Sequence, residues 1–190
     1  MTQTRKSPDA GRLTRIAMMA AISTVLSFYP EIPLAFFAPW LKIDFSFVPI
    51  LLTGYALGFW PGVIVLLIKN AFKLLQTTSA GVGEVADILV ACALLLPAVL
   101  AYRRKRTRGR ALIGMVIGIV CMTAVGVMAN QWILLPLYLG EALPRWSAEN
   151  PAYLWAAAAP FNLLKGIVIC GVTYALYKPL SRFLKNGLKG

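Results

Sequence analysis

Residues 111–136 read ALIGMVIGIVCMTAVGVMANQWILLP, and no charged residue occurs between Arg110 and Glu141. An α-helix needs about 20 mostly apolar residues to cross the hydrocarbon core of a bilayer, so this stretch indicates a membrane-spanning helix. The whole chain of 190 residues is 59% apolar and 14% charged, with a mean hydropathy of +0.72. Soluble domains are roughly 45–50% apolar and about 25% charged. A domain of this size could not hide so much apolar surface from water, so the sequence predicts an integral membrane protein.

Five further apolar stretches are long enough, by a looser standard, to cross a bilayer. Pro30 is expected to end the first helix, Trp60-Pro61-Gly62 to form a tight turn, and Pro179 to close the last helix. We therefore predict an all-α fold with a single membrane domain, residues 1–190, of which residues 1–11 form a flexible cytoplasmic N-terminus. The six predicted transmembrane helices cover residues 12–29, 45–59, 62–77, 84–102, 111–136 and 154–177.

The basic residues predict the orientation of these helices. With six spans, the N-terminus, the loops after the second and fourth helices, and the C-terminus share one side of the membrane. Fourteen of the 19 basic residues belong to these segments: Arg5, Lys6, Arg12, Arg15, Arg103, Arg104, Lys105, Arg106, Arg108, Arg110, Lys178, Arg182, Lys185 and Lys189. Short loops rich in lysine and arginine stay in the cytoplasm, so both termini are predicted to be cytoplasmic.

Two loops on the opposite side are longer than simple turns. Residues 30–44 are rich in proline and aromatic residues, and residues 138–153 contain proline, Trp146 and two glutamates. Long loops of this composition often cover a binding site. The tryptophans Trp40, Trp146 and Trp155 are equally compatible with simple anchoring at the membrane interface.

Two charged side chains fall inside the third predicted helix. Lys69 and Lys73 lie one turn apart, and Glu84 and Asp87 open the next helix on one face. Burying a lysine at the centre of a spanning helix costs roughly 2.5–3.5 kcal/mol on insertion scales, so such residues usually find a partner. The pattern favours a cluster of ion pairs that joins the third and fourth helices.

A different set of polar residues lies in the fifth and sixth predicted helices. Asn162 and Lys165 share one helix face, Asn130 lies in the fifth helix, and no carboxylate is close in sequence to neutralise Lys165. Carboxamides and one ammonium group can hydrogen-bond a neutral ring that carries carbonyls and ring nitrogens. The alternative is hydrogen bonding between helices, which contributes about 0.6 kcal/mol on average in membranes.

The sequence also argues against several functions. The net charge of +12 is placed at the ends of apolar runs and not over a groove, so nucleic acid is not the expected partner. No histidine is present, the three cysteines lack CxxC spacing, and no nucleotide-binding motif or catalytic constellation is found. We therefore expect no catalytic residues, no metal site and no cofactor.

Several motifs together resemble a known family. They are Leu41-Lys-Ile-Asp-Phe-Ser-Phe-Val-Pro49, Gly54-Tyr-Ala-Leu-Gly58, Lys69-Asn70, Gly81-Val-Gly-Glu84, Ala129-Asn130, Leu134-Leu-Pro136 and Pro160-Phe-Asn-Leu-Leu-Lys165-Gly. The chain resembles the riboflavin-specific S component of energy-coupling factor (ECF) transporters over most of residues 12–180. In that family a six-helix subunit in the bacterial cell membrane captures the vitamin and docks on a transmembrane coupling protein (the T component) driven by two ATPases.

This resemblance implies a function and a set of site residues. It implies that Leu41, Glu84, Asn130, Asn162 and Lys165 bind riboflavin, and that Ala17 and Ala21 form an AxxxA surface for docking on the coupling protein. It implies transport and not catalysis by this chain. Two alternatives stay open: an S component for another vitamin, or a small intramembrane enzyme or assembly factor that uses Lys69, Lys73, Glu84 and Asp87.

Overall fold

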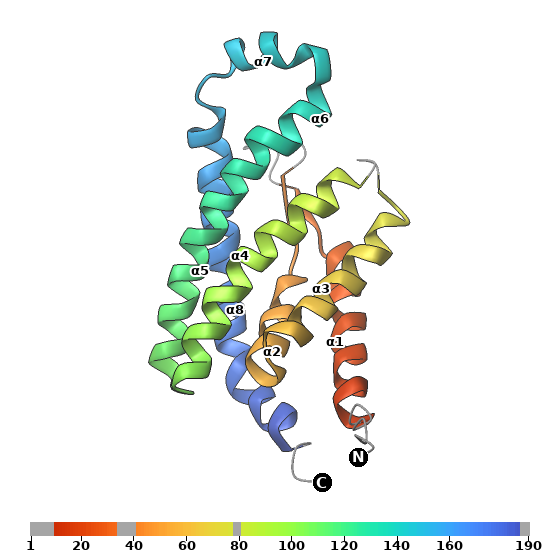
Figure 1. Cartoon of the computed structure of the whole chain (residues 1–190), viewed down its shortest axis with the longest axis vertical. Coiled ribbons are helices and arrows are strands. Elements are labelled where there is room, and N and C mark those ends of the chain that lie inside the picture. Colours follow the sequence, from red (N-terminus) through yellow and green to blue (C-terminus); the bar gives the residue numbers. More distant parts are fainter. Residues whose placement is uncertain (1–9, 34–40, 78–80, 187–190) are drawn as a thin grey trace, which may run out of the picture.

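Long helices stand side by side along the long axis of the molecule (Figure 1). The computed structural model describes residues 10–33, 41–77 and 81–186. The longer helices are α1 (Ala10–Phe28), α2 (Phe47–Leu57), α3 (Phe59–Leu74), α4 (Val82–Arg104), α5 (Arg108–Ala129) and α8 (Ala159–Asn186). The helical prediction is therefore confirmed, with one addition: strands β1 (Ile32–Pro33) and β2 (Lys42–Ile43) pair antiparallel.

Several predicted boundaries are wrong for identifiable reasons. The turn between α2 and α3 is made by Gly58, whose φ of 113° favours glycine, and not by Trp60-Pro61-Gly62. Pro61 lies in the first turn of α3, where a missing N–H costs nothing. Helix α8 continues past Pro179 to Asn186, because a proline removes one helical hydrogen bond without always ending the helix.

The segment expected as a loop over residues 138–153 is mostly helical. After α5 the chain continues through η1 (Asn130–Leu134), α6 (Leu135–Leu139), η2 (Gly140–Ala142) and α7 (Leu143–Glu149) before η3 (Leu154–Ala158) leads into α8. At the other end of the chain, α1 already begins at Ala10, inside the predicted flexible segment. The rest of that segment and Trp40 lie outside the described residues.

Helix α2 forms the centre of the bundle. It contacts α1, α3, α4 and α8, and every residue from Phe47 to Tyr55 is buried. Helices α4 and α5 pack closely, because a Cβ on Gly114 would lie 2.8 Å from the backbone oxygen of Ala98 and one on Gly118 would lie 2.7 Å from that of Leu94.

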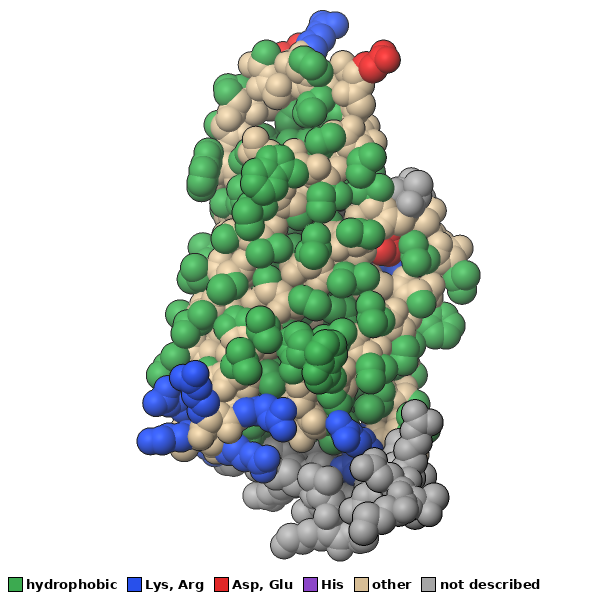
Figure 2. Space-filling model, in the orientation of Figure 1, with side chains coloured by type: hydrophobic (Ala, Val, Ile, Leu, Met, Phe, Trp, Pro, Cys, Tyr) green, Lys and Arg blue, Asp and Glu red, His purple; other side chains and the backbone are tan. Residues whose placement is uncertain are grey.

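The face of the molecule that Figure 2 shows is mostly apolar over its middle part, as contact with a bilayer requires. Three helical stretches are long and apolar enough to cross a membrane: Val82–Arg104, Arg108–Glu149 and Leu154–Tyr177. Helices α1, α2 and α3 also occupy predicted spans but are shorter or less apolar. The start of α1, the turns after α2 and α4, and the end of α8 lie at one end of the bundle, which we call the basic end (Figure 1).

Candidate binding site

A cavity of about 390 Å³ lies within the bundle, between the β1–β2 hairpin and helices α3, α4, α5 and α8. Sites for small molecules in proteins typically measure roughly 300–1,000 Å³. All five residues expected to bind substrate line this cavity: Leu41, Glu84, Asn130, Asn162 and Lys165. They come from four separate parts of the chain, and the fold brings these parts together around one cavity.

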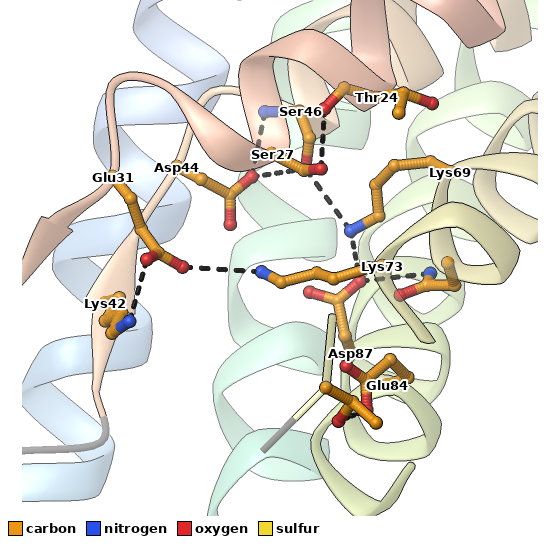
Figure 3. Close-up of polar contacts among 12 residues, drawn as sticks. Thr24, Ser27, Glu31, Lys42, Asp44, Ser46, Lys69, Lys73, Glu84 and Asp87 are labelled. Carbon is orange, nitrogen blue, oxygen red and sulfur yellow. Dashed lines mark hydrogen bonds and ion pairs between the residues drawn. The ribbon is translucent and has the colours of Figure 1, made fainter. Parts of the chain in front are cut away.

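The β1–β2 hairpin supplies one wall of the cavity and is tied to the bundle by ion pairs. Glu31, just before β1, accepts from the ammonium groups of Lys42 at 2.7 Å and Lys73 at 3.5 Å (Figure 3). Lys73 was expected to pair with Glu84 or Asp87, and this expectation is wrong. Glu84 instead accepts a hydrogen bond from the Thr77 hydroxyl at 3.1 Å.

A buried network of alternating charges lies beneath the cavity. The Lys69 ammonium is 2.6 Å from an Asp87 carboxylate oxygen and 3.3 Å from the Ser46 hydroxyl (Figure 3). Lys69 lies in α3 and Asp87 in α4, so the predicted ion pair between these two helices is confirmed. The Lys69 side chain is fully buried. Nearby, the Asn70 side-chain amide also donates to Asp87 at 3.2 Å.

Lys165 is not isolated, contrary to the expectation from its sequence neighbours. Its ammonium lies 3.5 Å from Asp44 and 4.0 Å from Asp87, and 4.5 Å from the centre of the Phe47 ring. Asp44 is a charged residue of the cavity lining that the sequence analysis missed. It belongs to the quoted Leu41-Lys-Ile-Asp motif, but nothing local connects that motif with α8.

Asp44 is only 3% exposed, yet it stays ionised. Burial alone would raise its pKa, but the ammonium groups of Lys165 and Lys69 and a hydrogen bond from Ser46 lower the pKa from 3.8 to about 2. A lowered folded-state pKa stabilises the fold fully above pH 3.8 and loses that contribution as the pH falls through about 2. Asp44 is therefore a fixed negative charge near neutral pH.

The charges around the cavity balance. The carboxylates of Glu31, Asp44, Glu84 and Asp87 face the lysines of the lining, which are Lys42, Lys73 and Lys165, with Lys69 paired to Asp87 beneath them. Four carboxylates against four ammonium groups leave no net charge. An uncharged ligand with a polar rim suits such a site better than an anion does.

The two asparagines are held in fixed orientations. Asn130 donates to the Gly126 backbone oxygen at 2.8 Å and accepts from the Tyr153 hydroxyl at 3.0 Å, while Asn162 donates to the Ala158 backbone oxygen at 2.8 Å. Each amide nitrogen carries two hydrogens, so each keeps one N–H for a ligand. Both residues are nearly fully buried, which makes a satisfied hydrogen bond to a ligand valuable.

Two π-helical segments lie next to these asparagines. Asn130 itself opens η1, and η3 ends one residue before α8, which carries Asn162. Single π-helical turns that interrupt α-helices are frequent at functional sites. The sequence carries no local pattern that predicts the π-helical segments η1 and η3.

Gly126 keeps Asn162 in place, and this leads to a prediction. A Cβ at Gly126 would lie only 2.5 Å from the Asn162 carboxamide carbon, so Gly126→Ala must displace that side chain. We expect several-fold weaker ligand binding, measured by titration, with a smaller effect on the unfolding temperature. Gly171→Ala is the matched control, because a Cβ there meets no atom within 4 Å. Equal affinities of the Gly126→Ala and unaltered chains would show that Asn162 is not held by this contact.

The Lys69–Asp87 pair leads to a second prediction. Lys69→Met leaves the Asp87 carboxylate without its closest cation, and removing one partner of a buried pair costs about 3–5 kcal/mol. We expect a clearly lower unfolding temperature in detergent. Lys42→Met is the control, since the Lys42 side chain is 45% exposed and its pair with Glu31 is worth less than about 1 kcal/mol. Similar losses in the two variants would contradict a structural role for Lys69.

Ala17 and Ala21 lie on the outer face of α1. Both are exposed, while Ile16, Met19 and Ala20 face the bundle. The exposed side also carries Leu13, Ile22 and Val25, which are 58%, 43% and 64% exposed. Small residues in an apolar helix face permit close approach of another helix.

Fold and site together define a class of protein: a helical membrane protein with a polar cavity of small-molecule size within its bundle. The comparison with known families agrees, because residues 11–177 match the family described as ECF transporter, substrate-specific component. The chain belongs to this family.

Individual relatives support the same assignment. The chain is 38% identical to the riboflavin transporter RibU of Staphylococcus aureus (strain TCH60), over 92% of this chain and 93% of the relative. It is 30% identical to RibU of Streptococcus thermophilus (strain ATCC BAA-250 / LMG 18311), over 97% and 86%. A solved structure titled as the S component of a bacterial ECF transporter superimposes with a TM-score of 0.79 at 36% identity, covering 92% of this chain and 97% of that one.

Proposed function

We propose that this chain is the riboflavin-binding subunit of an ECF transporter and captures the vitamin in the cavity between the β1–β2 hairpin and α8. The relatives described above are named as riboflavin transporters. The observation that carries the proposal is a cavity whose four carboxylates are balanced by three lysines of its lining and by Lys69, and whose lining includes the fixed amide groups of Asn130 and Asn162. Riboflavin is uncharged and flat and has carbonyls, ring nitrogens and an imide N–H at its edge.

We assign roles to the five cavity residues as part of this proposal. Asn130 and Asn162 hydrogen-bond the polar edge of the flavin, and Lys165 donates to a carbonyl, because its charge is already balanced by Asp44. Glu84 accepts from a ligand hydroxyl or N–H. Leu41 belongs to an apolar cluster with Phe161 and covers the ring face.

The chain is proposed to cross the bacterial cell membrane six times with both termini in the cytoplasm. The lysine and arginine residues in the turn after α4 support this orientation under the positive-inside rule. The cavity then lies toward the outside, where the vitamin is captured. The proposed partners are a T component and two ATPases, since the chain contains no nucleotide-binding motif of its own.

The absorption spectrum of the purified protein tests the choice of ligand. A flavin held in a cavity of this kind is expected to co-purify and to colour the preparation yellow. A colourless preparation that stays colourless after incubation with riboflavin and removal of excess would contradict the proposal. A preparation that instead retains another vitamin, such as biotin, would support an S component of different specificity.

An intramembrane enzyme or assembly factor is the less favoured reading. It would use Lys69, Lys73, Glu84 and Asp87 as its reactive groups. Lys69 and Asp87 are bound to each other at 2.6 Å, and Lys73 is bound to Glu31. These partnerships favour a structural role over a reactive one.

A further inference from the structure

The turn between α4 and α5 carries an unusually dense group of cations. Six of its eight residues are basic, all eight are exposed, and none of the six forms an ion pair with any described residue. We call residues 103–110 the basic turn. Its cations are Arg103, Arg104, Lys105, Arg106, Arg108 and Arg110.

No described carboxylate lies near enough to balance this charge. Most of the visible basic groups gather at the basic end of the molecule, whereas the visible acidic groups lie in the middle and at the opposite end (Figure 2). Six like charges this close repel one another unless an anion from outside the chain neutralises them. We therefore expect the basic turn to bind an anionic partner.

The start of α5 strengthens the positive field. Arg108 and Arg110 lie in its first turn, which contains no acidic residue, although the positive end of a helix dipole disfavours cations there. The space beside Gly109 is open, since a Cβ on this residue would meet no atom within 4 Å. The Arg110 N–H already donates to the Thr107 hydroxyl at 3.4 Å, so an anion that approaches here meets the arginine side chains and the open space beside Gly109.

The surface next to the basic turn is apolar. Leu100 on α4 and Leu112, Ile113 and Val116 on α5 are between 50% and 55% exposed. A soluble anion or an acidic protein would match the cations and leave these side chains unmatched. An anionic phospholipid matches both, with its phosphate at the cations and its acyl chains along the helices.

We propose that the basic turn is a binding site for an anionic phospholipid, independent of the vitamin site. The turn between α2 and α3 borders this site. The Arg103 guanidinium lies beside Gly58, 3.1 Å from the position of a Cβ on that glycine, and Trp60 follows with 73% of its surface exposed. Trp60 is therefore a natural fluorescent reporter for a lipid held at the basic turn.

The test uses the full chain in phosphatidylcholine vesicles that contain an equal share of either brominated phosphatidylglycerol or brominated phosphatidylcholine. Bromine quenches nearby tryptophans. We expect the anionic lipid to quench more strongly, with a relative association constant at least about threefold higher. The triple variant Arg104→Gln, Lys105→Gln, Arg106→Gln should remove this preference, and Trp60→Phe should remove its signal.

Arg145→Gln is the matched control, because Arg145 is an exposed cation of α7, far from the basic turn, and its loss should leave the preference intact. Equal quenching by the two lipids in the unaltered chain would overturn the proposal. So would a preference that survives in the triple variant or in Trp60→Phe. A triple variant that keeps its lipid preference but no longer assembles with its coupling and ATPase subunits would show that the basic turn binds protein instead.

Discussion

Asn162→Ala is expected to weaken riboflavin binding at least tenfold, which corresponds to about 1.4 kcal/mol. The Asn162 side chain is held by its bond to the Ala158 backbone oxygen, and the residue lines the cavity. In the proposed binding mode, removing the carboxamide leaves part of the flavin edge without a partner in a buried site, and that loss is costly. Titration of the purified variant by quenching of flavin fluorescence measures the effect.

Asn150→Ala is the matched control for this substitution. Asn150 makes the same kind of bond, to the Trp146 backbone oxygen, but it is exposed and does not line the cavity. Lys165→Ala should reduce affinity at least as much. It also removes the cation that pairs with the buried Asp44 carboxylate, which keeps its hydrogen bonds from Ser46, so the unfolding temperature must be measured as well. Unchanged affinity in a folded Asn162→Ala variant would remove this residue from the site.

Ala17→Trp or Ala21→Trp is expected to abolish riboflavin uptake by cells while leaving binding by the purified chain intact. Both alanines are exposed on the outer face of α1, away from the cavity, so a large side chain there would not disturb the bundle. It would keep a partner helix at a distance and prevent docking of the coupling protein.

Ala175→Trp is the matched control, because it makes the same change at an exposed alanine of α8. That variant should transport normally. If Ala17→Trp loses riboflavin binding together with uptake, then Ala17 packs inside the protein and the docking role is wrong. If uptake persists in both α1 variants, the coupling protein binds elsewhere.

Local patterns in the sequence were sufficient to predict the helices and much of the site. Apolar runs must be helical in a bilayer, because every backbone polar group has to be satisfied internally. Polar residues inside such runs are costly, so Asn130, Asn162 and Lys165 stood out as candidates, and all three line one cavity.

Pairings between distant segments could not be predicted in the same way. Asp44 precedes α2 and Lys165 lies in α8, and only the packing of α2 against α8 brings them together. The bond from Tyr153 to Asn130 and the pair of Glu31 with Lys73 arise likewise from tertiary contacts. The turn at Gly58 was missed, because a proline-glycine pair at Pro61-Gly62 is also typical of a turn and lies only three residues further on.

Titration of the unaltered, purified chain with riboflavin tests the central proposal most directly. Flavin fluorescence should fall as the ligand enters a cavity lined by Phe161 and Tyr138, and the curve should saturate at one molecule of riboflavin per chain. A linear, non-saturating response over the same range, in protein shown to be folded, would contradict the assignment of this cavity to riboflavin.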